Sequence, residues 1–390
     1  MKKRIVFLLT LSTCISVNAQ DSYTPIASGA NFPVKEVHLE FLREAQDVHS
    51  QREHLWNLWA SINEEAPSGG PLWETWLSAD HVFRPSESEV LAPPKVKNFE
   101  RPLQFVDLPS SAVPEAPGQS QFATVLFNQE AHDFVRSQKL YLAATLDEIN
   151  RSLTQQAVSL DNRDIPDFPR ESVVLKTVWL HVAANGRTPI PVWDFNPSRP
   201  DQSGNDIGTW PRSVVVDTTG ETIQRGILDQ GRKVVPLTSF YSVELTNHNL
   251  IRNSSPGDHM ILIAMHVTTK EIRDWVWGTF WWHDKADFGP YALNKTQNLR
   301  GVWRNYLMDV AFDSDIPREY EGSANAVINP YLEARFPMGM TSNCMTCHRK
   351  SAWPLASFLP IERGKISTSD QRFENRVRLD FLWSLGMRAK

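Results

Sequence analysis

Residues 274–284 read DWVWGTFWWHD and carry four tryptophans within eight positions. Successive side chains of a β-strand point to opposite faces of the sheet. One face would therefore hold Trp275, Trp277, Thr279, Trp281 and His283, and the other Val276, Gly278, Phe280 and Trp282. Because both sets are mainly apolar, this stretch predicts a strand with packing on both of its faces.

Several segments of similar amino-acid composition precede this stretch. They are rich in β-branched and aromatic residues, and several alternate with period two. They are VVLKTVWLHVA (173–183), PIPVWDF (189–195), RSVVVD (212–217), SFYSVEL (239–245) and HMILIAMHVTT (259–269). Turn-forming sequence separates them, so they predict a mostly antiparallel sheet system of about 110 residues.

Helical periodicity flanks the predicted sheet. Helices are expected at 35–62, 71–83, 129–153, 297–311 and 369–385. We therefore predict an α+β protein with a helical N-terminal part, an antiparallel β-rich middle and a helical C-terminal segment. The expected divisions are a helical segment at 20–83, a proline-rich linker or surface loop at 84–120, a helix-plus-β core at 121–296 and a C-terminal segment at 297–390.

The first 19 residues have the pattern of an export signal. Lys2, Lys3 and Arg4 precede an apolar run that is too short for a transmembrane helix, and small residues end at Ala19. The sequence LSTC around Cys14 resembles a lipoprotein junction, but Thr13 fits that junction poorly, so simple secretion is favoured. The sequence predicts a periplasmic or secreted protein with no membrane-spanning segment after cleavage.

The charge of the chain limits its partners. Loss of the three basic residues of the leader takes the formal net charge from −5 to −8. Nucleic-acid binding needs clustered Lys and Arg, so we expect no nucleic-acid partner. Such an acidic protein is suited to a basic redox partner or to a small-molecule substrate.

The stretch SNCMTCHRK, residues 342–350, contains the two cysteines that remain after leader cleavage, Cys344 and Cys347. A structural zinc site needs four ligands, and a second CxxC pair is absent from the sequence. The flanking sequence does not resemble the βαβ setting of a thioredoxin-like dithiol. A disulfide would close a very small loop, and it would leave His348 unexplained.

Covalent haem attachment accounts for all three residues of this motif. Two thiols bind the two vinyl groups of the haem, and the adjacent histidine reaches the iron. We therefore predict one haem c, with Cys344 and Cys347 as its anchors and His348 as the proximal iron ligand. The remaining alternative is a small disulfide beside a surface histidine.

Several residues are candidates for the ligand on the other face of the predicted haem iron. Met387 and His283 are the candidate distal ligands, and an open or water-bound face is the third option. Lys176 shares a predicted strand face with apolar residues, so it either extends to solvent or points into a distal pocket. His259 and His266 lie on opposite faces of their strand, so at most one of them can face a given cofactor.

The CMTCH stretch resembles the haem-attachment site of monohaem c-type cytochromes. Small members of that class carry the motif near the start of a helical domain, whereas about 320 mature residues precede it here. A haem motif after a β-rich region is similar in layout to cytochrome P460 and the β-type cytochromes c′. That resemblance implies an open distal face and a sheet lysine able to cross-link to haem, and the position to compare is Lys176.

Three functions remain open at this point. The first is single-electron transfer in the periplasm by a monohaem cytochrome. The second is a haem enzyme or ligand sensor with an open iron face, acting on peroxide, nitric oxide, hydroxylamine or a small organic molecule. The third is an exported binding protein without haem, in which the two cysteines form a disulfide.

Overall fold

The computed structural model describes residues 32–85, 98–105, 117–196, 207–221, 228–312, 326–362 and 365–390. The predicted leader at 1–19 lies outside these residues, as does much of the proline-rich stretch predicted at 84–120.

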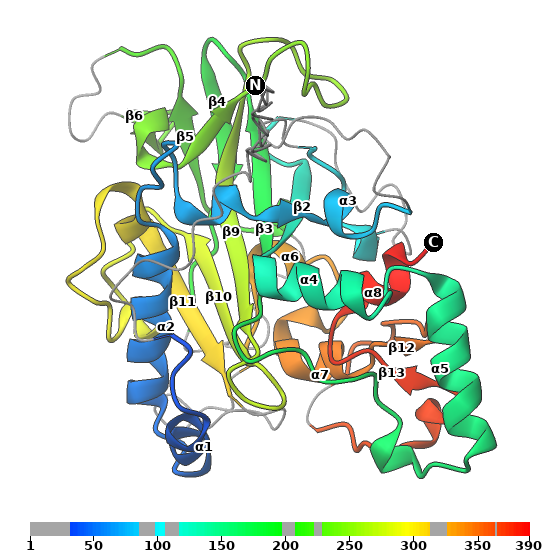
Figure 1. Cartoon of the computed structure of the whole chain (residues 1–390). Helices are drawn as coiled ribbons and strands as arrows, with labels where there is room; N and C mark the ends of the chain where they lie inside the picture. Colours follow the sequence, from blue (N-terminus) through cyan, green and yellow to red (C-terminus); the bar gives the residue numbers. More distant parts are fainter. Residues whose placement is uncertain are drawn as a thin grey trace, which may run out of the picture.

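A large antiparallel sheet runs through the middle of the molecule (Figure 1). Its strands are β1 (Leu77–Ser78), β2 (Gln121–Phe127), β3 (Val173–Val182), β8 (Ser242–Glu244), β9 (His259–Thr269), β10 (Val276–Trp282) and β11 (Tyr306–Ala311). The order is β1-β2-β3-β9-β10-β11, and β8 pairs with the start of β9. Strands β3 and β9 pair along nearly their whole length, so they form the centre of the sheet.

The alternation predicted for DWVWGTFWW is confirmed, because every residue of β10 is buried. On one face, Phe280 stacks on Trp59 with ring centroids 4.2 Å apart, and the close approach of Leu55 leaves Gly278 no room for a Cβ. On the other face, Trp277 contacts His348 with centroids 4.6 Å apart. The sheet thus separates a helix-covered side from the side that carries the CxxCH motif.

Two smaller sheets accompany the large one. The first is ordered β4-β5-β7-β6, and its β5–β7 pair is parallel. Its strands are β4 (Arg187–Pro191), β5 (Ser213–Asp217), β6 (Leu228–Asp229) and β7 (Arg232–Pro236). The second pairs β12 (Ala352–Trp353) with β13 (Val377–Arg378) in the C-terminal part of the chain.

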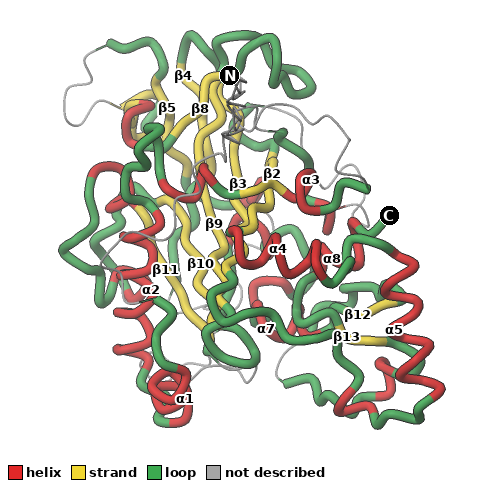
Figure 2. The backbone as a smooth tube through the Cα atoms, in the orientation of Figure 1, coloured by secondary structure: helices red, strands yellow, loops and turns green. Residues whose placement is uncertain are grey.

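Figure 2 shows the helices, in red, mainly on the two sides of the yellow strands of the large sheet. They are α1 (Glu36–Glu44), α2 (Val48–Ile62), α3 (Ala79–Val82), α4 (Gln129–Ser137), α5 (Ala143–Gln155), α6 (Pro330–Glu333), α7 (Cys344–Arg349) and α8 (Trp383–Arg388). Figure 1 shows α2 on one side of the large sheet and α7 and α8 on the other. The α+β class predicted from the sequence is therefore confirmed.

Two helices predicted as continuous are each divided. The stretch 35–62 forms α1 and α2, because Gln46 has a left-handed φ of 52° and the Asp47 side chain caps Ser50 N at 3.1 Å. The stretch 129–153 forms α4 and α5, with Lys139 at a φ of 54° between them. In both cases a local C-terminal stop interrupts an otherwise helical pattern.

Three other helix predictions are wrong. Residues 297–311 form a 3-10 turn (Gly301–Asn305) and then β11, whose six residues are all buried against β10. Residues 369–385 form another 3-10 turn (Gln371–Phe373), β13 and only the start of α8. Residues 71–83 form a 3-10 turn (Leu72–Thr75), β1 and the single-turn α3. Pairing with distant strands outweighs the local helical pattern in each of these segments.

Among the described residues, no helix combines the length and the apolar character that crossing a membrane requires.

Candidate functional site

The CxxCH motif forms a short helix of its own. The Asn343 side chain caps α7 by accepting a hydrogen bond from Met345 N at 2.8 Å, and Cys344 N donates to the Val327 carbonyl at 3.0 Å. Cys344 and Cys347 are three residues apart in the helix, so they lie on one face of it. Both are free thiols.

Burial raises the pKa of both thiols. The pKa of Cys347 rises to about 12, and that of Cys344 rises well above its usual value. A reactive redox dithiol needs at least one cysteine with a lowered pKa, because the thiolate is the nucleophile. The folded environment therefore disfavours dithiol redox chemistry at this pair.

A cleft lies between α7 and the large sheet. It is partly open to solvent. From the sheet it is lined by side chains that share one face of four neighbouring strands: Ala123 and Val125 of β2, Val174 and Lys176 of β3, His266 and Thr268 of β9, and Trp277 of β10. Cys344, Cys347 and His348 line it from α7, and Trp383, Met387 and Arg388 from α8. Both thiols and the histidine thus border one largely apolar space.

His348 is held in a defined tautomer. Its Nδ1 lies 2.8 Å from the Phe381 carbonyl oxygen, which can only accept, so Nδ1 carries the proton. Burial lowers the pKa of the imidazole to about 4, so the ring is neutral near pH 7 and Nε2 keeps its lone pair. Metal-binding histidines typically donate their other ring N–H to a carbonyl or carboxylate, and His348 has that arrangement.

Three ionisable side chains gather on the wall of the cleft that faces α7. Lys176 of β3 and His266 of β9 are direct cross-strand partners. Glu333, at the end of α6, places Oε1 3.8 Å from His266 Nε2. Sequence reasoning missed Glu333 entirely and gave His266 no role, because only the sheet register and the fold of residues 326–343 bring them to the motif.

Burial perturbs all three groups. It lowers the pKa of Lys176 to about 8, raises that of Glu333 to about 7, and lowers that of His266 well below its usual value, with the nearby Lys176 charge adding to the last effect. Such shifts are common where protons are exchanged with a substrate or ligand. The sequence left Lys176 either extending to solvent or pointing into a distal pocket. In the structure its side chain lines the cleft.

The residues present fit a covalently bound haem. Two thiols on one helix face and a neutral, oriented histidine border one mainly apolar cleft. The described residues contain no group of three or more His, Cys, Asp or Glu able to hold a metal ion. A haem requires no such group, because its porphyrin supplies four nitrogens and the protein needs to supply only an axial ligand.

The two distal candidates lie in different places. Met387 lines the cleft from α8. His283 does not line it: its Nε2 lies 3.2 Å from Asp194 Oδ1 and 3.1 Å from an Arg212 nitrogen, and its Nδ1 accepts from Lys285 N at 3.0 Å. This polar network joins the end of β10 to the small sheet, so His283 has a structural setting, and the structure does not bring it to the motif.

No family model, curated protein or solved structure matches this chain.

Proposed function

We propose that this chain is an exported monohaem c-type cytochrome that transfers single electrons in the periplasm. The observation that supports this most directly is the cleft bordered together by Cys344, Cys347 and the oriented imidazole of His348. A haem held there by two thioether bonds and by His348 Nε2 would supply an iron that changes oxidation state by one electron.

The residues of this chain would serve such a cofactor in distinct ways. His348 binds as a neutral ligand, and its Nδ1–H bond to Phe381 fixes the plane of the ring. The Trp277 indole packs against that ring and restricts its rotation. The apolar wall limits water around the iron, which lowers the reorganisation that accompanies electron transfer.

Localisation and partner follow from the leader and the charge. An export signal delivers the chain to the compartment in which haem c is attached, and the acidic mature protein suits a basic electron partner. Met387, which lines the cleft, is the candidate sixth ligand for a carrier.

A second candidate function is supported by a different observation. Lys176, His266 and Glu333 bring three perturbed ionisable groups to the cleft wall, and burying such groups costs stability. A bare electron carrier has no use for them. A haem enzyme or sensor with an open iron face would use them to bind a small polar molecule and to move its protons. The layout similarity to cytochrome P460 supports the same candidate through Lys176.

The experiment is expression of the full chain, leader included, in a host with c-type haem maturation. The purified protein is examined for haem that survives denaturation, and optical spectra are recorded oxidised, reduced, and reduced with carbon monoxide. The matched control is the double variant Cys344→Ser/Cys347→Ser, which we expect to lose covalent haem.

Each spectrum selects one function. Covalent haem whose reduced spectrum is unchanged by carbon monoxide supports the electron carrier. Covalent haem whose spectrum shifts with carbon monoxide supports the enzyme or sensor. A colourless protein rejects both and leaves the exported binding protein with a Cys344–Cys347 disulfide.

A further inference from the structure

The carbonyl that holds His348 belongs to an unusual turn. Asp380 and Phe381 both have left-handed backbone angles, with φ of 46° and 66°. For residues other than glycine this conformation costs roughly 1–2 kcal/mol each. Two such residues in succession need tertiary contacts to hold them, and those contacts determine where the Phe381 carbonyl points.

One contact holds the turn from the end of β9. Lys270 follows β9 directly, and its ammonium group is buried. Its Nζ donates to Asp380 Oδ1 at 2.7 Å, to the Arg273 carbonyl at 2.6 Å and to Asp167 Oδ1 at 3.1 Å. These three acceptors match the three N–H donors of a lysine ammonium, so the charge is fully partnered.

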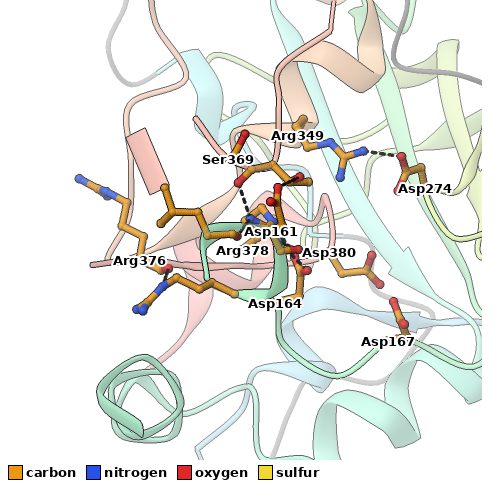
Figure 3. A network of polar contacts seen from close by, with 12 residues as sticks. Asp161, Asp164, Asp167, Asp274, Arg349, Ser369, Arg376, Arg378 and Asp380 are labelled. Atoms are coloured by element: carbon orange, nitrogen blue, oxygen red, sulfur yellow. Dashed lines mark hydrogen bonds and ion pairs between the residues drawn. The ribbon is translucent and has the colours of Figure 1, made fainter. Parts of the chain in front are cut away.

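Two further contacts come from the same region of the sheet. Asp274, in the β9–β10 connection, forms an ion pair with Arg349, which is drawn in Figure 3 together with Asp380. The Arg349 guanidinium lies over the Phe381 ring, 4.2 Å from its centroid. Trp277, near the start of β10, contacts both His348 and Phe381.

We propose that Lys270, through its buried ion pair with Asp380, is a positioning residue for His348, because it fixes the backbone turn that presents the Phe381 carbonyl to the imidazole. This inference rests on the proposed function only in naming His348 as the ligand of a haem iron. The arrangement itself concerns a hydrogen bond that the chain makes without the cofactor.

The ion pair has a predictable effect on the ligand. A strong Nδ1–H bond makes the imidazole a better electron donor and so favours the oxidised iron. When the ion pair is removed, the strained turn relaxes and the Nδ1–H bond weakens. The reduced form should then be favoured, and the ring proton should exchange faster with solvent.

The test uses the charge-balanced double variant Lys270→Met/Asp380→Asn, which leaves the net charge unchanged. We expect the ratio of reduced to oxidised protein at a fixed ambient potential to rise about threefold or more, because a weaker Nδ1–H bond makes the imidazole a weaker electron donor to the proposed iron. Exchange of the His348 Nδ1 proton, followed by NMR on protein labelled with ¹⁵N-histidine, should accelerate, because the hydrogen bond that protects this proton is weaker. The single variant Lys270→Arg keeps the ion pair. Its redox ratio and its rate of His348 Nδ1 proton exchange should therefore stay close to those of the wild type.

Lys295→Met is the matched control. Lys295 is also largely buried, donates to the Ala286 carbonyl and pairs with Asp287 at 3.6 Å, so its partners lie outside the Asp380–Phe381 turn. The variant Lys295→Met should lower the stability of the fold without changing the redox ratio or the exchange of the His348 Nδ1 proton. If the double variant does not fold, Asp380→Asn alone should shift both readouts in the same direction by a smaller amount.

Unchanged proton exchange and an unchanged redox ratio in the folded double variant would overturn the inference, as would equal shifts in Lys295→Met. A colourless protein rejects the proposed function instead, and the exchange of the His348 ring proton can still be measured on that same sample.

Discussion

Lys176 and His266 are cross-strand partners in the β3–β9 pair, on the face of the sheet that looks toward α7, and Glu333 approaches His266 to 3.8 Å from α6. The two central strands of the sheet bring two bases, and α6 brings an acid, to the cleft that carries the CxxCH motif. Attachment of the proposed haem would not by itself require this cluster, whose behaviour can be measured.

Glu333 should make stability depend on pH. Its folded-state pKa of about 7 lies above the ordinary value of 4.5, so the folded state holds the proton more tightly and stability is lost as pH rises from about 4.5 to about 7. For the chain without haem, Glu333→Gln should remove this loss and gain about 2–3 kcal/mol at pH 8, with little change at pH 4. Urea unfolding at both pH values measures this.

Glu362→Gln is the control for that experiment. Glu362 is paired with Arg372 and its pKa is lowered, so its replacement should not stabilise the chain at pH 8. An equal loss of stability between pH 4.5 and 7 in wild type and in Glu333→Gln would contradict the raised pKa of Glu333.

His348→Gly should separate haem attachment from iron ligation. Both cysteines remain, so covalent haem should still be present on a denaturing gel, but the optical spectrum should change because the axial ligand is lost. Added imidazole should restore the original spectrum by occupying the space of the deleted ring. His283→Ala, which removes a histidine outside the cleft, should leave the spectrum as it is. An unaltered spectrum in His348→Gly would show that another residue binds the iron.

Met387→Ala tests the sixth position. If Met387 ligates the iron, the reduced wild-type protein should not bind carbon monoxide, and the variant should bind it readily, because removal of the thioether opens that face. Carbon monoxide titration followed optically gives the answer. Binding of equal affinity in both proteins would place Met387 beside the iron without coordination, and would favour the enzyme or sensor.

Gly278→Ala tests the packing of the sheet against α2. A Cβ at Gly278 would lie 2.5 Å from Leu55 Cδ1, and Leu55 is fully buried. We expect a loss of about 1–3 kcal/mol in the free energy of unfolding, because the core has no space for the added methyl group. The second change Leu55→Val should recover part of that loss. An unaltered urea midpoint in Gly278→Ala would mean that the Leu55 side chain makes room for the methyl group without loss of packing.

Much of the sheet could be predicted from sequence, and the helices less well. The long strands β3, β9 and β10 are rich in β-branched and aromatic residues, so their local signal agrees with their final place. From the sequence we predict no strand at β2, although its sequence QFATVLF carries the β-branched and aromatic residues typical of a strand. The stretch 297–311 was predicted as a helix because its apolar spacing fits both states, and only the edge of β10 selects the strand.

The candidate site divides in the same way. The CxxCH chemistry is local, since a five-residue spacing alone brings two thiols and an imidazole together, and the sequence by itself determined that part of the site. The sequence also determined the α+β class, because segments rich in β-branched and aromatic residues are flanked by segments with helical periodicity. Only the tertiary structure decided that Met387 reaches the cleft while His283 does not, and that Lys176, His266 and Glu333 meet there. Those placements depend on strand register and on turns such as Asp380–Phe381, whose conformations are set by contacts between residues more than a hundred positions apart.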